Sequence, residues 1–465
     1  MNFKIIFLFF SLIIAIECYI KIPFTYFPST LNKDDKPKNI MSSILDLKMF
    51  GLLEIGTPKQ KCHIPINFGS NTFFLPEKSS FHYDIKYNIS LYDNKNSSSF
   101  SIIKDEEEYE GENFLDAYYV NDVLYFGENK INLDFYLTTS YTFPQLGGLG
   151  LQLYPSSIEN TATPDIEKTF MRKIKTKGLA NNYIWSVFYE KQKIETGEIN
   201  GYILLGDYPH LSINFPDNSK YNFSLNYIDA EVYNKKIVET KFIMHKTEVI
   251  KDNKILMNIN ENFYVNLNYN FQGIKVPEKI GIYLEKNIFN SLDFCHKDKV
   301  SLITINTFYY CDNHKDKINQ LKKIFPIIKL ENKILNSTFT INIDNLLYTK
   351  GNHVYILLIF EENDNNDWNL GIPFLQQYQF SINQDSKKIY YYKKKELPQK
   401  NENREGNDIY NILIIVLSTF LFLLGLIIGI LICYKNTRKK RKNELDENYD
   451  YMVNDGENNA IINYN

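Results

Sequence analysis

Short runs of β-branched and aromatic residues, separated by Gly, Asn, Asp and Pro, fill most of the chain between residues 42 and 395. The runs at 202–205 and 354–360 are typical. Such side chains favour strands, and the residues that separate the runs favour turns. Helical patterns are few, and the better candidates are 165–177 and 315–324. The pattern therefore predicts an all-β fold with a few short helices.

Two longer apolar runs lie outside this segment. The first, residues 5–16, follows a charged start and predicts a signal peptide over residues 1–18. The second, 412–433, has 22 residues without a charge, enough to cross a hydrocarbon core of roughly 30 Å, and predicts a transmembrane helix over 410–434. Six of the eight residues from 435 to 442 are Lys or Arg. The positive-inside rule then predicts a single-pass type I protein whose N-terminal part is lumenal or extracellular and whose tail is cytoplasmic.

The segments next to these runs differ in composition from the β-rich part. Residues 19–41 are interpreted as a short pro-like segment that precedes it. Residues 396–409 are polar, contain Pro398 and Gly406, and predict a stalk. The cytoplasmic tail, 435–465, begins with basic residues, and its acidic, Asn-rich part from 443 to 465 predicts disorder.

Charge and histidine content exclude several classes of function. The formal net charge is −3, and no basic stripe is interleaved with aromatic residues, so a nucleic-acid partner is not expected. The seven histidines are scattered and form no set with metal-ligand spacing, so neither a metal nor another cofactor is expected. Neither Gly-x-Ser-x-Gly nor His-Glu-x-x-His occurs, which removes the usual serine-hydrolase and zinc-protease signatures.

Cysteines and glycosylation sequons fit an oxidising compartment. Cys18 leaves with the signal peptide and Cys433 lies at the membrane, so three cysteines remain in the lumenal part and cannot all pair internally. Cys62 is expected to be a buried free thiol, although cleavage ahead of Cys18 would permit a bridge between the two. Four Asn-x-Ser/Thr sequons predict glycans, at Asn88, Asn96, Asn222 and Asn336.

The most specific motif lies in residues 50–76, FGLLEIGTPKQKCHIPINFGSNTFFLP. An Ile-Gly-Thr-Pro turn ends at Pro58, Asn67 follows nine residues later, and a proline comes nine residues after that. In order and spacing the segment resembles the first-lobe signature of pepsin-like aspartic proteases (peptidase A1). Asn67 stands where that family has its first catalytic aspartate, and Gly69 and Ser70 match the end of its Asp-Thr-Gly-Ser loop.

Four later segments extend the resemblance over about 350 residues. They are similar to the family's glycine-rich strand, its buried Phe-Ser strand, its Gly-x-Leu-x-Phe-Gly-Gly hairpin and its Leu-Gly-Asp segment, and they lie at 147–156, 185–188, 201–207 and 368–382.

The resemblance implies a bilobal fold with an N-terminal lobe over 42–212 and a C-terminal lobe over 213–395. It also implies a second-lobe disulfide between Cys295 and Cys311. The tyrosine of the family's mobile flap would be Tyr109, although its acidic neighbours fit a charged surface hairpin equally well.

The second catalytic loop is harder to place. Asn268 precedes a proline by nine residues, the interval that separates Asn67 from its own proline. Because Asn270 and Phe271 stand where the family has Gly and Thr or Ser, a shift of one or two residues stays open.

The chemistry of the family needs two carboxyl groups that share one proton. Asn67 and Asn268 are carboxamides, which do not titrate in the useful range. No Asp-x-Gly sequence occurs anywhere in the chain. The next residue at each loop, whose hydroxyl braces the opposite loop in the family, is Phe68 or Tyr269. No catalytic residue is therefore expected.

These features favour a membrane-anchored pseudo-protease whose cleft binds a peptide or a partner protein. One alternative is an active aspartic endopeptidase of the secretory pathway with unusual catalytic residues, and another is an adhesive or structural surface protein. Gly425 and Gly429 form a Gly-x-x-x-Gly pair through which the membrane helix could dimerise.

Overall fold

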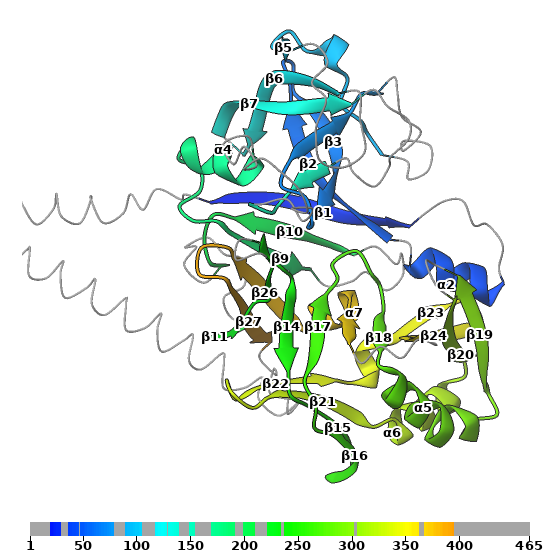
Figure 1. The fold of residues 1–465 in the computed structure, drawn as a ribbon. Coiled ribbons are helices and arrows are strands. Elements are labelled where there is room, and N and C mark those ends of the chain that lie inside the picture. The colour runs from blue at the N-terminus through cyan, green and yellow to red at the C-terminus, as the bar shows by residue number, and fades with distance from the viewer. Residues whose placement is uncertain are drawn as a thin grey trace, which may run out of the picture. The chain divides into compact units, whose positions relative to one another are not determined.

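The computed structural model describes residues 19–28, 36–45, 47–78, 89–104, 117–127, 129–138, 148–153, 169–190, 199–209, 221–233, 237–301, 305–361 and 367–394. Strands dominate this part of the chain and the helices are short (Figure 1). The mostly β fold predicted from the sequence is thereby confirmed. Among these residues no helix is long and apolar enough to cross a membrane. The predicted signal peptide, stalk, transmembrane helix and tail lie outside the described ranges.

The largest sheet joins strands from both halves of the chain. Its 13 strands run in the order β11-β27-β26-β9-β10-β1-β2-β3-β8-β4-β7-β6-β5. The pairing of β26 with β9 carries this sheet from the C-terminal part of the chain to the N-terminal part (Figure 1). The strands have these bounds: β1 (Ile20–Pro28), β2 (Leu47–Ile55), β3 (Gln60–Asn67), β4 (Phe73–Pro76), β5 (Ser101–Lys104), β6 (Ala117–Phe126), β7 (Asn129–Thr138), β8 (Gly148–Gly150), β9 (Ile184–Tyr189), β10 (Asn200–Leu205), β11 (Tyr221–Asp229), β26 (Tyr378–Asn383) and β27 (Lys388–Lys394).

Two further sheets belong to the second half. One follows the order β14-β17-β25-β18-β24-β20-β19, with β23 paired to β24, and the other the order β16-β15-β21-β22. A small pair, β12 (Val232–Tyr233) with β13 (Ile237–Val238), lies apart. The remaining strands have these bounds: β14 (Lys241–Met244), β15 (Lys246–Lys251), β16 (Lys254–Ile259), β17 (Phe263–Leu267), β18 (Ile274–Val276), β19 (Cys295–Ser301), β20 (Ile305–Asp312), β21 (Ile327–Asn332), β22 (Ser337–Ile341), β23 (Leu347–Lys350), β24 (His353–Glu361) and β25 (Trp368–Leu370).

The described residues contain few helices, as predicted, but they include helices beyond the two candidate ranges named from the sequence. α6 (Lys315–Ile324) coincides with its predicted range, and α4 (Phe170–Thr176) covers part of the other prediction. The helices α2 (Pro37–Leu45), α5 (Glu278–Asn287) and α7 (Ile372–Leu375) were not predicted. In α5 the interior Gly281, a poor helix former, lies against the ring of Phe360, where a Cβ would come within 2.7 Å.

The same strand arrangement occurs twice. In the first half β4 is parallel to β7 and antiparallel to β8, and β3 is parallel to β8. In the second half β18 is parallel to β24 and antiparallel to β25, and β17 is parallel to β25. Asn67 lies six residues before Phe73, the partner of Leu149, and Asn268 lies six residues before Ile274, the partner of Leu370. The two asparagines therefore occupy equivalent positions, and the second loop needs no register shift.

Of residues 19–41, interpreted from the sequence as a pro-like segment, the structure describes 19–28 and 36–41, and both parts pack against other elements. β1 pairs with β10 on one side and with β2 on the other, so it lies within the large sheet. α2 buries Ile40, Met41, Ile44 and Leu45 in an apolar cluster with residues of the second half, among them Tyr355. β1 is therefore part of the large sheet, and α2 packs against the second half shortly before the chain enters β2.

The disulfide between Cys295 and Cys311 is confirmed, and it joins residues directly opposite each other on β19 and β20. Cys62 is a free, buried thiol whose pKa burial raises to about 12, so it is not an exposed nucleophile. Asn96 and Asn336 are exposed, as sequons that carry glycans must be. Asn88 and the side chain of Asn222 lie outside the described residues.

A buried carboxylate in β6 was not noticed in the sequence. Asp122 is 0% exposed and accepts hydrogen bonds from the hydroxyl groups of Tyr92 and Ser99 and, at 2.7 Å, from the backbone N–H of Val123. Burial, and then the Asp122 carboxylate, raise the pKa of Tyr92 well above its ordinary value, so Tyr92 stays a donor. The hydrogen bonds from Tyr92 and Ser99 to Asp122 connect the segment that follows residue 89 to β6.

Candidate functional site

The first asparagine loop leaves the end of β3. The Oδ1 atom of Asn67 accepts hydrogen bonds from the backbone N–H groups of Gly69 at 3.0 Å and Ser70 at 3.1 Å. From β8, Gly150 donates its backbone N–H to the carbonyl of Thr72 at 3.0 Å. A Cβ on Gly150 would lie 2.6 Å from the backbone of Thr72, so only glycine permits this close approach. The glycine-rich strand thus packs under the loop, as the resemblance implied.

The second loop repeats this arrangement. The Oδ1 atom of Asn268 accepts a hydrogen bond from the backbone N–H of Asn270 at 3.1 Å. The N–H of Gly371 donates to the carbonyl of Gly273 at 2.9 Å, and a Cβ on Gly371 would come within 1.9 Å of the carbonyl oxygen of Phe271. Each loop therefore uses its asparagine oxygen as an acceptor for its own backbone. A carboxamide can hold the loop in this way without being able to exchange a proton.

Aromatic rings connect the two loops where the family has hydroxyl groups. Phe68 and Tyr269 stack with ring centroids 4.5 Å apart and an interplanar angle of 25°. Trp185 from β9 packs against both rings, with centroids 5.3 Å from Phe68 and 5.4 Å from Tyr269. The sequence predicted that the hydroxyl brace is lost; the structure shows that an apolar contact between the loops takes its place. We call Phe68, Trp185 and Tyr269 the aromatic clamp.

Two further tyrosines extend the aromatic clamp, and neither was noticed in the sequence. The hydroxyl of Tyr26 in β1 donates to the backbone carbonyl of Tyr269, and it lies 3.2 Å from the hydroxyl of Tyr189. Burial raises the pKa of Tyr26, Tyr189 and Tyr269 well above the ordinary value, so all three are neutral. Within the described part of the chain the hydroxyl of Tyr269 has no hydrogen-bond partner. No local pattern in the sequence predicts these contacts, because they join residues more than 160 positions apart.

An open hollow of about 330 Å³ lies beside the clamp. Both loops contribute to its lining: Phe68, Gly69, Gln152, Glu239, Thr240, Asn266, Leu267, Asn268, Tyr269 and Asn270. Of the predicted site residues, Phe68, Gly69, Asn268 and Tyr269 line the hollow, and Asn67 does not. Glu239 is the one carboxylate among the described residues that line the hollow.

Other predicted features give no second site. Tyr109 lies outside the described residues. In the ranges that the structure describes, no group of three His, Cys, Asp or Glu side chains is placed to hold a metal ion.

The family model described as eukaryotic aspartyl protease matches residues 48–393, well over half of the chain. The chain belongs to the eukaryotic aspartyl protease family. Among curated proteins, no sequence matches the chain significantly.

Membership of the aspartyl protease family shows which reaction the two loops would have to catalyse. Aspartyl protease chemistry needs a pair of carboxyl groups that share a proton. Here the two equivalent loop positions hold carboxamides, and the rings of Phe68 and Tyr269 occupy the space between the loops. A single carboxylate, that of Glu239, is left beside them among the described residues.

Proposed function

We propose that this protein is a non-catalytic member of the aspartyl protease family, which binds an extended peptide or an extended segment of a partner protein in the hollow beside its two loops. The observation that carries the proposal is the stack of Phe68 on Tyr269 between two loops whose leading residues are asparagines. Neither loop can supply the acid or the base of peptide hydrolysis. The hollow remains open and has a mostly polar lining, which suits an extended peptide backbone.

A second candidate is an active endopeptidase that uses an unusual residue, and Glu239 favours it as the carboxylate that lines the same hollow as Asn268. One carboxylate cannot take both roles of a proton-sharing pair at once. Cleavage that is lost in Glu239→Gln would support this candidate over the proposal.

Restoring the acids is expected not to restore activity. In the full-length protein in detergent, Asn67→Asp combined with Asn268→Asp leaves peptide turnover at the uncatalysed background, because the aromatic clamp still replaces the hydroxyl brace. The measurement is cleavage of a quenched fluorescent peptide library at acid pH, with and without pepstatin. Asn258→Asp, exposed on β16, is the control for an added carboxylate. Pepstatin-sensitive cleavage by the unmodified protein would contradict the proposal that it is non-catalytic.

We extend the proposal to the membrane: the folded part is displayed on the lumenal or extracellular side by the apolar run at 412–433. Two exposed sequons, at Asn96 and Asn336, support it. In cells, Asn96→Gln and Asn336→Gln are each expected to remove one glycan, seen as a gel shift that glycosidase treatment abolishes, while Asn258→Gln changes nothing. A protein extracted by alkaline carbonate, or one without glycans, would contradict this topology.

A further inference from the structure

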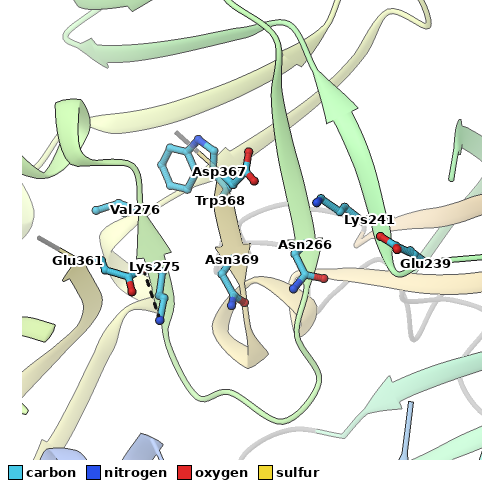
Figure 2. A pocket seen from close by; sticks show the side chains of 9 residues that line it. All are labelled: Glu239, Lys241, Asn266, Lys275, Val276, Glu361, Asp367, Trp368 and Asn369. Carbon is cyan, nitrogen blue, oxygen red and sulfur yellow. Dashed lines mark ion pairs between the residues drawn. The ribbon is translucent and has the colours of Figure 1, made fainter. Parts of the chain in front are cut away.

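A second hollow, of about 350 Å³, lies next to the first and shares Glu239 and Asn266 with it. Its lining is polar for a peptide site: Glu239, Lys241, Asn266, Lys275, Val276, Glu361, Asp367, Trp368 and Asn369 (Figure 2). Because the two hollows share residues, an extended ligand that passes the aromatic clamp reaches this surface next.

Four of these side chains form one row across the sheet. Lys241 of β14 is the register partner of Asn266 of β17, which is the partner of Asn369 of β25, and Asn369 in turn pairs with Lys275 of β18. Register partners project from the same face of a sheet. Figure 2 shows the two amides projecting on the same side of neighbouring strands. We call these four residues the polar row.

The side-chain oxygens of the two asparagines in the polar row have weak hydrogen-bond partners or none among the described residues. The Oδ1 atom of Asn369 is buried and has no partner among the described residues. The Oδ1 atom of Asn266 accepts only a long bond, 3.4 Å, from Thr240 among the contacts described. The ammonium nitrogen of Lys275 lies 3.7 Å from the Oε2 atom of Glu361, and that of Lys241 lies 4.1 Å from the centroid of the Tyr264 ring. A ligand that fits must therefore offer a donor to Asn369 and an acceptor to the amide and ammonium groups.

The lining disfavours ionised side chains for two different reasons. Three carboxylates, of Glu239, Glu361 and Asp367, accompany two ammonium groups, of Lys241 and Lys275. An acidic side chain would face the excess of carboxylates, and a basic one would offer no acceptor to the amide and ammonium donors of the polar row. An apolar side chain would displace water from all of them and return no hydrogen bond. A neutral side chain with both a donor and an acceptor avoids each penalty.

The polar row is closed at one end. Ile359 is the register partner of Lys275 in the next strand, and it belongs to the apolar cluster that α2 covers. Leu45 of α2 and Phe271 lie against Gly273 at the foot of the second loop. The occupant is therefore confined to the surface from the clamp to Lys275, which is short enough for a single extended segment.

We propose that the polar row gives the cleft its specificity, and that it selects extended peptide segments that carry asparagine or glutamine side chains. The carboxamide supplies two N–H donors and a carbonyl acceptor on separate atoms without charge, whereas a hydroxyl group has a single donor. This inference rests on the proposed peptide-binding function and adds the class of ligand to it.

The test uses the full-length protein in detergent and four fluorescent ten-residue peptides in which Gly alternates with Gln, Glu, Arg or Leu. The alternation presents the test side chain in any register along an extended strand. Fluorescence anisotropy is expected to give a dissociation constant for the Gln peptide at least about fivefold lower than for the other three, a modest share of what a site built for hydrogen bonds discriminates.

Two variants tie this preference to the polar row. Asn266→Leu combined with Asn369→Leu is expected to abolish the preference for Gln, while Asn258→Leu on β16 leaves it unchanged. Asn369→Asp keeps the shape of the side chain, so it tests the row even if the double variant does not fold; it is expected to weaken the Gln peptide and favour the Arg peptide.

The outcomes separate the two proposals. Peptides that bind without preference for Gln, or that keep the preference in both polar-row variants, overturn the inference and leave peptide binding in place. Failure of all four peptides to bind overturns the peptide-binding function and this inference together.

Discussion

Replacing Tyr269 with alanine is expected to lower the free energy of unfolding by about 4 kcal/mol. The side chain is 2% exposed, stacks on Phe68 and meets Trp185 edge to face, so its removal leaves a cavity between the two halves. Urea unfolding followed by tryptophan fluorescence measures the change, because Trp185, one of two tryptophans, lies in the aromatic clamp itself.

The control for Tyr269 is Tyr227→Ala, which removes a tyrosine that is 40% exposed and is expected to cost less than about 1 kcal/mol. A double-mutant cycle with Phe68→Ala is expected to show a coupling of about 1 kcal/mol between the stacked rings. Independent, additive effects of the two replacements would show that the stack does not join the loops energetically.

Loss of the buried carboxylate in β6 has an effect of similar size. Asp122→Ala is expected to lower the free energy of unfolding by about 4 kcal/mol, because the buried hydroxyl groups of Tyr92 and Ser99 lose a charged acceptor. Tyr92→Phe removes one of these donors and is expected to cost about 2 kcal/mol. Both are measured by urea unfolding against the exposed Asp293→Ala. A cost for Asp122→Ala no greater than for this control would mean that the carboxylate is not needed for stability.

The strand content and the position of Asn67 could be predicted from the sequence because both depend on local pattern. Asn67 follows a turn and precedes a proline at intervals of nine residues, which match the first-lobe motif of the aspartyl protease family. The position of Asn268 could be predicted only from one interval, the nine residues to the following proline. The register between β18 and β25 then showed that Asn268 is equivalent to Asn67. The loss of the hydroxyl brace was also readable, since Phe68 and Tyr269 stand at the positions concerned.

What replaces the brace could not be predicted. The stack of Phe68 on Tyr269 and the hydroxyl of Tyr26 depend on residues that are distant in sequence and become neighbours only in the large sheet. The polar row is equally hidden: Lys241, Asn266 and Asn369 lie on separate strands, and each alone looks like an ordinary exposed polar residue. Only the strand registers show that they share a face.

β1 has a consequence for how such a protein can be controlled. Many proteases are held inactive by a leading segment that is later cut away. Here the leading segment provides Ile20–Pro28, which is hydrogen-bonded along both edges, to β10 and to β2. Release of this strand would leave two rows of unpaired backbone groups in mid-sheet and remove Tyr26 from the carbonyl of Tyr269. A cut between residues 28 and 47 that is followed by loss of β1 is therefore expected to destabilise the fold.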